Sequence, residues 1–420
     1  MADLLALSAR IIDEGITDEP VNRVSGELSE VADGVAVVEA FSHVVAFRTD
    51  DGLVLFDTSV AGFGARCRDA LRGWSSDRVS TIVYTHGHVD HVGGARAFVD
   101  EAAERGDPAP QVVAHENVPV RFDRYDLTNG YNAAINRRQF GSGRGIGPGA
   151  DRFFDDWVRP GTTFEQSLAL DVGGTEVELH HERGETDDHL WAWIPSHRAV
   201  CAGDFLIWAF PNAGNPQKVQ RYPVEWARAM RAMKAMEPEL YLPAHGLPIE
   251  GRERIAGVLD DVAIALEGLV RDVLHLMNEG ARLDDIVHTV RVPAELLAKP
   301  YLRPTYDEPE FVVRNIWRLY GGWWDGNPAN VKPAADADIA AEVAALAGGA
   351  GRLADRAREL AATDVRLACH LVEWAVQAAP DDRDVHAARA EVYRLRRSGE
   401  LSLMSKGIFG TAAAESEARL

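Results

Sequence analysis

The pattern of hydrophobic and polar positions changes once along the chain. Over the first three hundred residues, short runs of β-branched and aromatic residues, typical of buried strands, alternate with stretches whose apolar positions recur at helical spacing. Asp50, Asp51 and Gly52 separate two of the strand-like runs and form a hairpin signal. We therefore predict an α/β region with strands within 34–60, 80–84, 111–115, 168–181 and 191–202, and with helices at 65–74, 92–105, 252–277 and 283–290.

The last hundred residues follow a different pattern. From residue 337 to about residue 397, Ala, Leu, Glu and Arg dominate, and apolar residues recur at helical spacing, as at Leu353, Ala357 and Leu360. Pro380 separates two helices, so the region looks like antiparallel helical hairpins of the tetratricopeptide kind. Because such pairs rarely bury all their apolar faces alone, the pattern favours a homodimer over a helical extension packed on its own domain.

Three further segments carry weaker signals. Residues 1–30 are of mixed character and are predicted to form an N-terminal arm, and the tail after residue 408 is predicted to be mobile. Residues 117–163 are predicted to be irregular, and segments of that length are usually functional or disordered. The glycine-rich run at 141–149 lacks the Lys-Ser/Thr pair of a phosphate-binding loop, so we interpret it as a mobile cover over the site.

Composition narrows the class of protein. The chain has 420 residues, enough for one large domain and a smaller one, and its net charge of −21 argues against a nucleic-acid partner. Cys67, Cys201 and Cys369 are far apart, which indicates neither a disulfide framework nor a thiolate metal site. No signal peptide and no transmembrane span is recognised, so the expected location is the cytoplasm.

Candidate chemistry is concentrated at residues 85–91, Thr-His-Gly-His-Val-Asp-His. Three histidines and an aspartate lie within six positions, between the predicted strand at 80–84 and the predicted helix at 92–105. His86 and His88 should project together from the extended part of this turn, whereas Asp90 and His91 turn towards a second point. A single metal would not need four ligands from so short a turn. Imidazole and carboxylate donors suit Zn²⁺, so the pattern predicts two zinc ions.

The string His86-x-His88-x-Asp90-His91 resembles the signature of the metallo-β-lactamase-fold hydrolases, which bind two zinc ions. The resemblance implies an αββα sandwich and extends to three later positions. Glu185 stands where many relatives carry histidine, as in the alkylsulfatase branch. Asp204 matches the bridging carboxylate, for which alkylsulfatases use glutamate, and His245 matches the last zinc histidine.

The resemblance implies how these seven donors are shared. One zinc takes His86, His88 and Glu185; the other takes Asp90, His91 and His245, with Asp204 and a hydroxide bridging both. The role of Asp57 stays open from sequence. It closes a predicted strand, so it either steadies a metal ligand, as in the family, or caps the next helix.

Residues 311–328 also resemble the alkylsulfatases, at the start of their dimerisation domain. We therefore expect an α/β fold with two domains. A metallo-β-lactamase αββα sandwich should occupy residues 1–310, and an all-α helical dimerisation domain should occupy residues 311–420.

The implied reaction is hydrolysis of an alkyl sulfate, a small anionic molecule with an apolar tail, by metal-activated hydroxide. Asp90 and His189 are the catalytic candidates, Asp90 through the metal site and His189 either as an acid or as a residue that orients a ligand. Hydroxide is expected to attack carbon, because sulfate leaves without a proton. Candidates for binding sulfate are cations and hydrogen-bond donors, namely Arg137, Arg138, Arg221, Asn132 and Tyr131. Candidates for contacting the tail are Trp208, Phe210, Trp323 and Trp324.

Three alternatives remain at this point. The same metals could serve a phosphodiester, lactone or thioester substrate, because one fold hosts many reactions. A carboxylate-rich donor set also tolerates iron, but no flavin-binding domain follows to support a redox role. A non-catalytic interaction protein is the third alternative, and the complete donor set argues against it.

Overall fold

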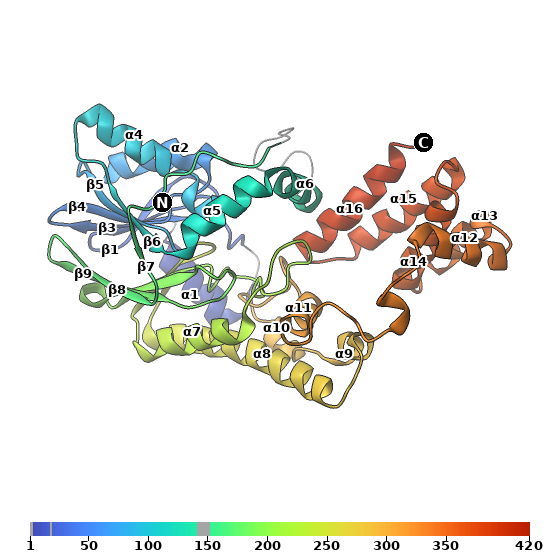
Figure 1. Ribbon diagram of the computed structural model, residues 1–420. Coiled ribbons are helices and arrows are strands. Elements are labelled where there is room, and N and C mark those ends of the chain that lie inside the picture. Colours follow the sequence, from blue (N-terminus) through green and yellow to red (C-terminus); the bar gives the residue numbers. More distant parts are fainter. Residues whose placement is uncertain (1–2, 17–18, 141–151) are drawn as a thin grey trace. The chain divides into compact units, whose positions relative to one another are not determined.

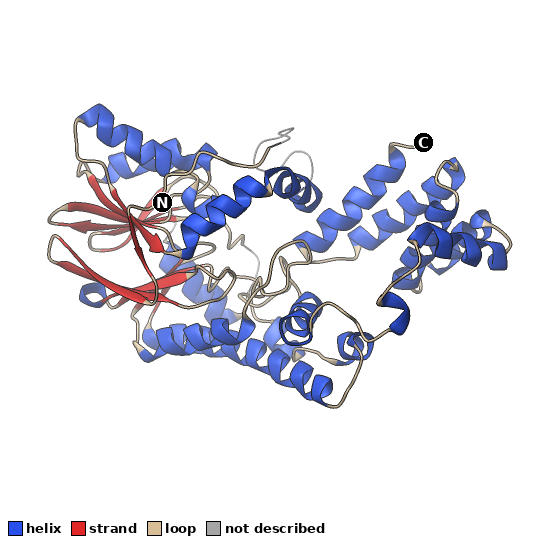
Figure 2. Ribbon diagram, viewed as in Figure 1, coloured by secondary structure: helices blue, strands red, loops and turns tan. Residues whose placement is uncertain are grey.

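The computed structural model describes residues 3–16, 19–140 and 152–420. It divides into two compact units, which are described separately. The first unit comprises residues 1–129, 152–281 and 285–321, and the second comprises residues 130–151, 282–284 and 322–420. The strands of the described residues lie in the first unit (Figure 2).

The first sheet begins as a meander and ends as a parallel sheet. Neighbouring strands from β1 to β4 pair antiparallel, and β4, β5, β6 and β7 then pair parallel in that order. β3 and β4 form the hairpin predicted at residues 50–52. The strands are β1 Leu28–Ala32, β2 Val35–Val38, β3 Val44–Thr49, β4 Gly52–Phe56, β5 Val79–Val83, β6 Gln111–His115 and β7 Thr162–Phe164.

The second sheet has the order β13-β12-β11-β10-β9-β8. Its neighbours pair antiparallel except β11 and β12, which run parallel. The ends of β11 and β12 that carry the following loops therefore meet at one edge of the sheet. The strands are β8 Ser167–Val172, β9 Thr175–His181, β10 Leu190–Ile194, β11 Ala199–Gly203, β12 Leu240–Pro243 and β13 Ile249–Glu250.

The two sheets pack face to face around an apolar core. Val45 and Val54 of the first sheet and Leu179 and Ala192 of the second belong to one buried cluster. Figure 1 shows helices on the outer face of each sheet, which completes a four-layer αββα sandwich. The predicted fold is thus confirmed. The helices of this unit are α1 Leu4–Glu14, α2 Ala61–Trp74, α3 Val89–Val92, α4 Ala95–Arg105, α5 Asn117–Leu127, α7 Pro223–Ala235, α8 Arg252–Asn278, α10 Ala294–Leu297 and α11 Pro309–Gly321, with α9 Leu283–Thr289 at its boundary.

The second unit is helical, as predicted. Its core is built largely from alanines with a few larger residues, and small side chains let helices approach closely. Asp364, Asp382 and Ser402 each accept a backbone N–H bond at the start of a helix, which defines where three of these helices begin. The helices are α6 Asn129–Phe140, α12 Asp336–Ala347, α13 Ala350–Leu360, α14 Val365–Ala378, α15 Arg383–Ser398 and α16 Leu403–Glu417.

The structure contains helices that the sequence did not predict. Residues 117–140 form α5 and α6, the N-terminal arm contains α1, and α16 continues to Glu417. α6 buries polar side chains, Asn132 and Asn136, so it has no apolar stripe for a hydrophobic pattern to reveal. α16 contains Gly407, where a β-carbon would lie 2.0 Å from the carbonyl oxygen of Gln139, so glycine allows α6 to pack against α16. The predicted mobile cover at 141–149 lies outside the described residues.

Candidate metal centre

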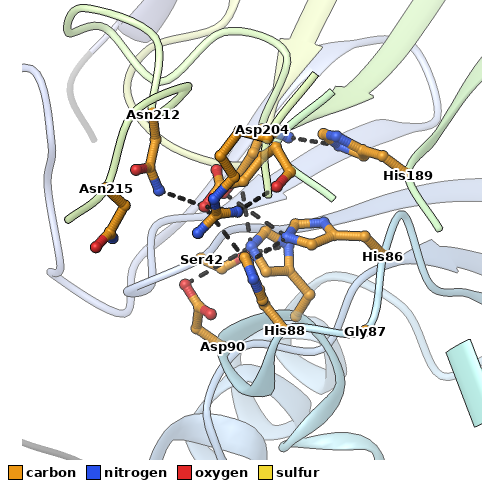
Figure 3. Close-up of polar contacts among 12 residues, drawn as sticks. Ser42, His86, Gly87, His88, Asp90, His189, Asp204, Asn212 and Asn215 are labelled. Carbon is orange, nitrogen blue, oxygen red and sulfur yellow. Dashed lines mark hydrogen bonds and ion pairs between the residues drawn. The ribbon is translucent and has the colours of Figure 1, made fainter. Parts of the chain in front are cut away.

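Four candidate donors follow β5: His86 and His88 lie on the turn after the strand, and Asp90 and His91 lie within α3. The strand ends at Val83, and α3 begins one residue after His88. His86 and His91 are fully buried, whereas His88 retains 16% and Asp90 19% of their side-chain exposure. The Nε2 atom of His86 lies 2.8 Å from Nδ1 of His88 (Figure 3). The imidazoles therefore converge within the first turn after the strand.

The second sheet supplies the other three donors from separate loops. Glu185 follows β9, Asp204 follows β11 and His245 follows β12, so each lies just after a strand end. The Nε2 atom of His91 lies 3.3 Å from Oδ1 of Asp204, and Nε2 of His245 lies 3.4 Å from the same oxygen. Within the described residues, donor atoms approach within 4.8 Å of one another in the groups His86–His91–Asp204, Asp90–His91–His245 and His88–Glu185–Asp204. The fold thus gathers all seven predicted donors.

The state of these donor atoms fits a metal centre. In the described part of the chain, His91 Nε2, Glu185 Oε2 and Asp204 Oδ1 are buried without a hydrogen-bond partner. Burial and the nearby carboxylates of Asp204 and Asp90 raise the pKa of Glu185 well above its usual value, against the opposing effect of Arg221. Buried lone pairs without donors are costly unless a cation satisfies them. Imidazole nitrogens and carboxylate oxygens are the ligands that divalent metals prefer.

Asp57 supports the histidine turn. Its Oδ2 accepts a 2.6 Å bond from Nδ1 of His91, and its carboxylate also accepts from the backbone N–H and the hydroxyl of Thr85, at 2.8 and 2.7 Å. The alternative that Asp57 caps the next helix is wrong, because Val60 occupies that position with no side-chain cap. Holding one imidazole nitrogen leaves Nε2 of His91 to face the other donors.

A buried ion pair holds the same turn from its other side. Oδ2 of Asp188 lies 2.6 Å from Nε of Arg121 and accepts a 3.2 Å bond from the backbone N–H of Gly87. Arg121 also contacts Asp187, and both Arg121 and Asp188 are almost fully buried. Gly87 lies between His86 and His88, so this pair positions the backbone of both candidate ligands.

Glu185 is supported by side chains from residues 212–221. The amide of Asn212 donates to its Oε1, and the guanidinium of Arg221 lies 3.1 Å from that oxygen and also donates to the backbone carbonyl. Asn315 of α11 holds the backbone of Arg221 through a 3.0 Å bond to its carbonyl. Asp307 accepts from the N–H groups of Gly214 and Asn215, at 2.6 and 3.1 Å, so the region after residue 300 anchors this loop.

His189 lies beside Asp204 (Figure 3). Its ring stacks on Phe205 with centroids 4.1 Å apart, and its Nε2 accepts a 3.2 Å bond from the backbone N–H of Asp204. Burial lowers the pKa of His189 to about 3. Of the two roles left open by the sequence, the geometry favours orientation of a ligand over proton donation.

The candidate substrate-binding residues fall into two groups. Arg221 lies at the donor cluster and is bound to Glu185. The other four belong to α6 in the second unit, where Tyr131 is exposed, Arg138 lines a cavity with residues of α15 and α16, and Asn132 and Arg137 lie between them along the helix.

The structure does not support the prediction that Trp208 and Phe210 of the first unit contact the apolar tail of the substrate. Trp208 and Phe210 are fully buried, and the indole N–H of Trp208 donates to the carbonyl of Leu247, so both are core residues. Trp323 and Trp324 belong to the second unit.

Several residues of the centre escaped the sequence reasoning. Arg121, Asp188 and Asn212 carried no motif that marks them. Lys218 and Tyr306 also interact electrostatically with Glu185 and Asp90. Burial and the charge of Arg221 lower the pKa of Lys218 to about 8, while the two carboxylates act in the opposite direction. Burial in the folded chain identifies Arg121, Asp188 and Asn212, and the interactions with Glu185 and Asp90 identify Lys218 and Tyr306.

Two family models match the chain. The metallo-beta-lactamase superfamily model covers residues 37–245, and the alkyl sulfatase dimerisation model covers residues 282–419. Within the described residues, no helix combines the length and apolar character needed to cross a membrane.

Curated relatives and a solved structure point the same way. A linear primary-alkylsulfatase from Pseudomonas sp. is 26% identical over 88% of this chain and 73% of its own length. An (R)-specific secondary-alkylsulfatase from Pseudomonas sp. is 27% identical over 83% of this chain, which spans 56% of that relative. The structure of a stereoselective inverting sec-alkylsulfatase from Pseudomonas sp. shares the fold with a TM-score of 0.82 at 24% identity, covering 94% of this chain and 66% of that one. The chain therefore belongs to the metallo-beta-lactamase superfamily, in its alkylsulfatase-like branch.

Proposed function

We propose that this protein is a metal-dependent hydrolase that cleaves an alkyl sulfate to an alcohol and sulfate. The observation that carries the proposal is the complete donor set with a carboxylate, Glu185, paired with Arg221 where many relatives of the superfamily use histidine. The match to the alkyl sulfatase dimerisation model and the names of the curated relatives support the same substrate class.

We propose two zinc ions per chain. His86, His88 and Glu185 would hold one ion, Asp90, His91 and His245 would hold the other, and Asp204 would contact both. Divalent cations bound here would lower the pKa of water, supply hydroxide near neutral pH and stabilise developing negative charge. Metal analysis of protein purified without chelator should find about two zinc ions per chain. A metal content near zero would contradict this assignment.

The substrate would approach from the more open side of the donor set. His88, Asp90 and His245 keep 16 to 19% of their side-chain exposure, whereas His86 and His91 are fully buried. The positive charges of Arg221 and Lys218 lie beside the carboxylates on the Glu185 side, which favours an anionic group there. The phenol of Tyr306 stays protonated, because burial and the charges of Glu185 and Asp90 raise its pKa, so it can donate a hydrogen bond.

We propose that the C–O bond breaks, because sulfate is a far weaker base than an alkoxide. Hydroxide attack on sulfur would expel an alkoxide, which needs a proton, and the geometry of His189 commits its Nε2 to the backbone of Asp204. Attack on carbon breaks the C–O bond, and the electron pair leaves with sulfate, which needs no proton. The product alcohol then carries the oxygen of solvent water.

Hydrolysis in ¹⁸O-labelled water, followed by mass spectrometry of both products, tests this assignment. Label in the alcohol is expected, and label in the sulfate would show attack on sulfur. The same preparation should be assayed with a phosphodiester, a lactone and a thioester. Turnover of one of these without turnover of any alkyl sulfate would replace the proposed substrate class.

We also propose that the helical unit forms a homodimer, since residues 282–419 match the dimerisation model. Light scattering of the intact chain should give the mass of a dimer. A monomer at micromolar concentration would contradict this assembly.

A further inference from the structure

An exposed aromatic ring lies against a candidate metal ligand. Phe41, in the loop between β2 and β3, keeps 45% of its surface exposed. Its ring contacts the imidazole of His245 edge to face, with centroids 5.8 Å apart. His245 is one of the donors on the more open side of the cluster, so the Phe41 ring lies where a bound molecule would extend away from the metals.

The loop that carries Phe41 is held firmly on both sides of the ring. The backbone N–H of His43 donates to the carbonyl of Ala244 at 2.7 Å, and Nε2 of His43 donates to the carbonyl of Gly246 at 2.6 Å. These two carbonyls flank His245 in the sequence. Nδ1 of His43 accepts a 3.2 Å bond from the backbone N–H of Ala40, which is consistent with a single neutral tautomer. The loop and the His245 segment therefore form one hydrogen-bonded assembly.

The residue after Phe41 joins the loop to the other half of the site. The hydroxyl of Ser42 lies 3.2 Å from Nδ1 of His91, and Figure 3 shows Ser42 beside the donors. Ser42 and His43 are both buried, so Phe41 is the exposed residue of a segment whose neighbours are anchored. An aromatic ring presented from a rigid segment loses little conformational entropy when an apolar group packs on it.

We propose that Phe41 is a specificity-determining residue that packs against the apolar tail of the substrate and makes turnover depend on tail length. This inference rests on the proposed alkyl sulfate hydrolysis, which supplies an anionic head at the metals and a tail that must leave the donor cluster. Phe41 replaces the buried Trp208 and Phe210 as the contact for the tail in the first unit.

The test compares Phe41→Ala and Phe41→Leu with the wild type on butyl, octyl and dodecyl sulfate. Loss of the ring should lower kcat/KM for octyl and dodecyl sulfate about tenfold in Phe41→Ala, with less than about a twofold change for butyl sulfate. The kcat/KM of Phe41→Leu for octyl and dodecyl sulfate should lie between the values of the wild type and of Phe41→Ala. Ile264→Ala is a matched control, because Ile264 is 47% exposed on α8 and should leave all three rates unchanged. Metal content should be equal in all four proteins.

Binding of butyl and dodecyl sulfonate, which lack the cleavable ester oxygen, tests the role of Phe41 separately from the proposed hydrolysis of alkyl sulfates. Phe41→Ala should lose about tenfold in affinity for dodecyl sulfonate and little for butyl sulfonate. If the wild type turns over no alkyl sulfate, the proposed reaction fails, and the sulfonate series still reports on Phe41. Equal chain-length dependence in wild type and Phe41→Ala, in rate or in binding, would overturn the role of Phe41.

Discussion

The two sheets contribute to the candidate metal centre in different ways. The first sheet supplies His86, His88, Asp90 and His91 from one turn, which buried carboxylates hold partly through backbone N–H groups. The second sheet supplies donors from three loops, and the one that the sequence marks as unusual, Glu185, is held by side chains of residues 212–221. The first arrangement is local and the second is assembled from distant segments. Substitutions in the two halves should therefore have different effects on stability and on metal binding.

This difference shows where each half is vulnerable. The histidine turn depends on the charge of Asp57 and on the Arg121–Asp188 pair, which lie fully inside the fold. Glu185 depends on a loop that is itself anchored by Asp307 and Asn315. We expect defects at the turn to reduce both stability and metal binding, whereas defects at residues 212–221 should act mainly on metal binding.

The largest effect is expected for Arg121→Met. This change leaves the carboxylate of Asp188 buried without its partner, which should lower the free energy of unfolding by about 3–5 kcal/mol. Urea denaturation of the zinc-loaded protein measures it. Arg159→Met removes an exposed partner of Asp123 on α5 and serves as the control, with an expected loss below about 1 kcal/mol. Equal losses in the two variants would show that the Arg121–Asp188 pair adds nothing beyond a surface pair.

Asp57→Ala should weaken metal binding about 10–100-fold, because residues that orient a ligand imidazole have effects of this size. Competition with a chromophoric zinc chelator measures the affinity. Asp69→Ala, which removes an exposed carboxylate on α2, should match the wild type. Unchanged affinity in Asp57→Ala would mean that His91 is positioned without its carboxylate partner.

Asn212→Ala tests the second half of the centre. The amide of Asn212 donates to Glu185, so its loss should reduce zinc affinity about tenfold. The free energy of unfolding of the metal-free protein should fall by no more than about 1.5–3 kcal/mol, which is the usual contribution of one hydrogen bond to a charged group. A large loss of stability with normal zinc affinity would contradict the distinction between the two halves.

The smallest effect concerns a contact between the two sheets. His115 at the end of β6 stacks on His181 at the end of β9, with centroids 3.7 Å apart, and burial lowers the pKa of His115 to about 4. An unfolded histidine titrates near pH 6.5, so between about pH 4 and 6.5 the unfolded state binds more protons. The contribution of neutral His115 is therefore present above pH 6.5 and is lost as the pH falls towards 4.

His115→Gln should remove this part of the pH dependence. Denaturation at pH 7.5 and pH 5 should show that the variant loses less stability on acidification than the wild type. The slope of the free energy of unfolding against pH should differ between the two proteins by the equivalent of up to one bound proton. Identical slopes would mean that His115 is protonated in the folded protein at pH 5 as readily as in the unfolded chain.

Local sequence determined much of this protein. Many of the strands and helices follow from side-chain periodicity, and the run from His86 to His91 marks the candidate metal turn because its donors lie within one segment. Glu185, Asp204 and His245 could be selected only through resemblance to a family, because donors about 20 to 60 residues apart share no local pattern. Helix α6 was missed for a related reason, since its buried residues mix polar side chains with Ala133 and Ile135.

The tertiary structure alone decided what each supporting residue does. Asp57 could cap a helix or hold a histidine, and the packing of β4 beside β5 brings it to His91 and Thr85. Arg221 was one of several candidate cations for sulfate, and the fold buries it against Glu185. Nothing in the sequence marked Phe41, and the fold places its ring beside His245. The cost of burying a charge or a polar atom depends on the partners that long-range packing provides, and no local pattern in the sequence encodes those partners.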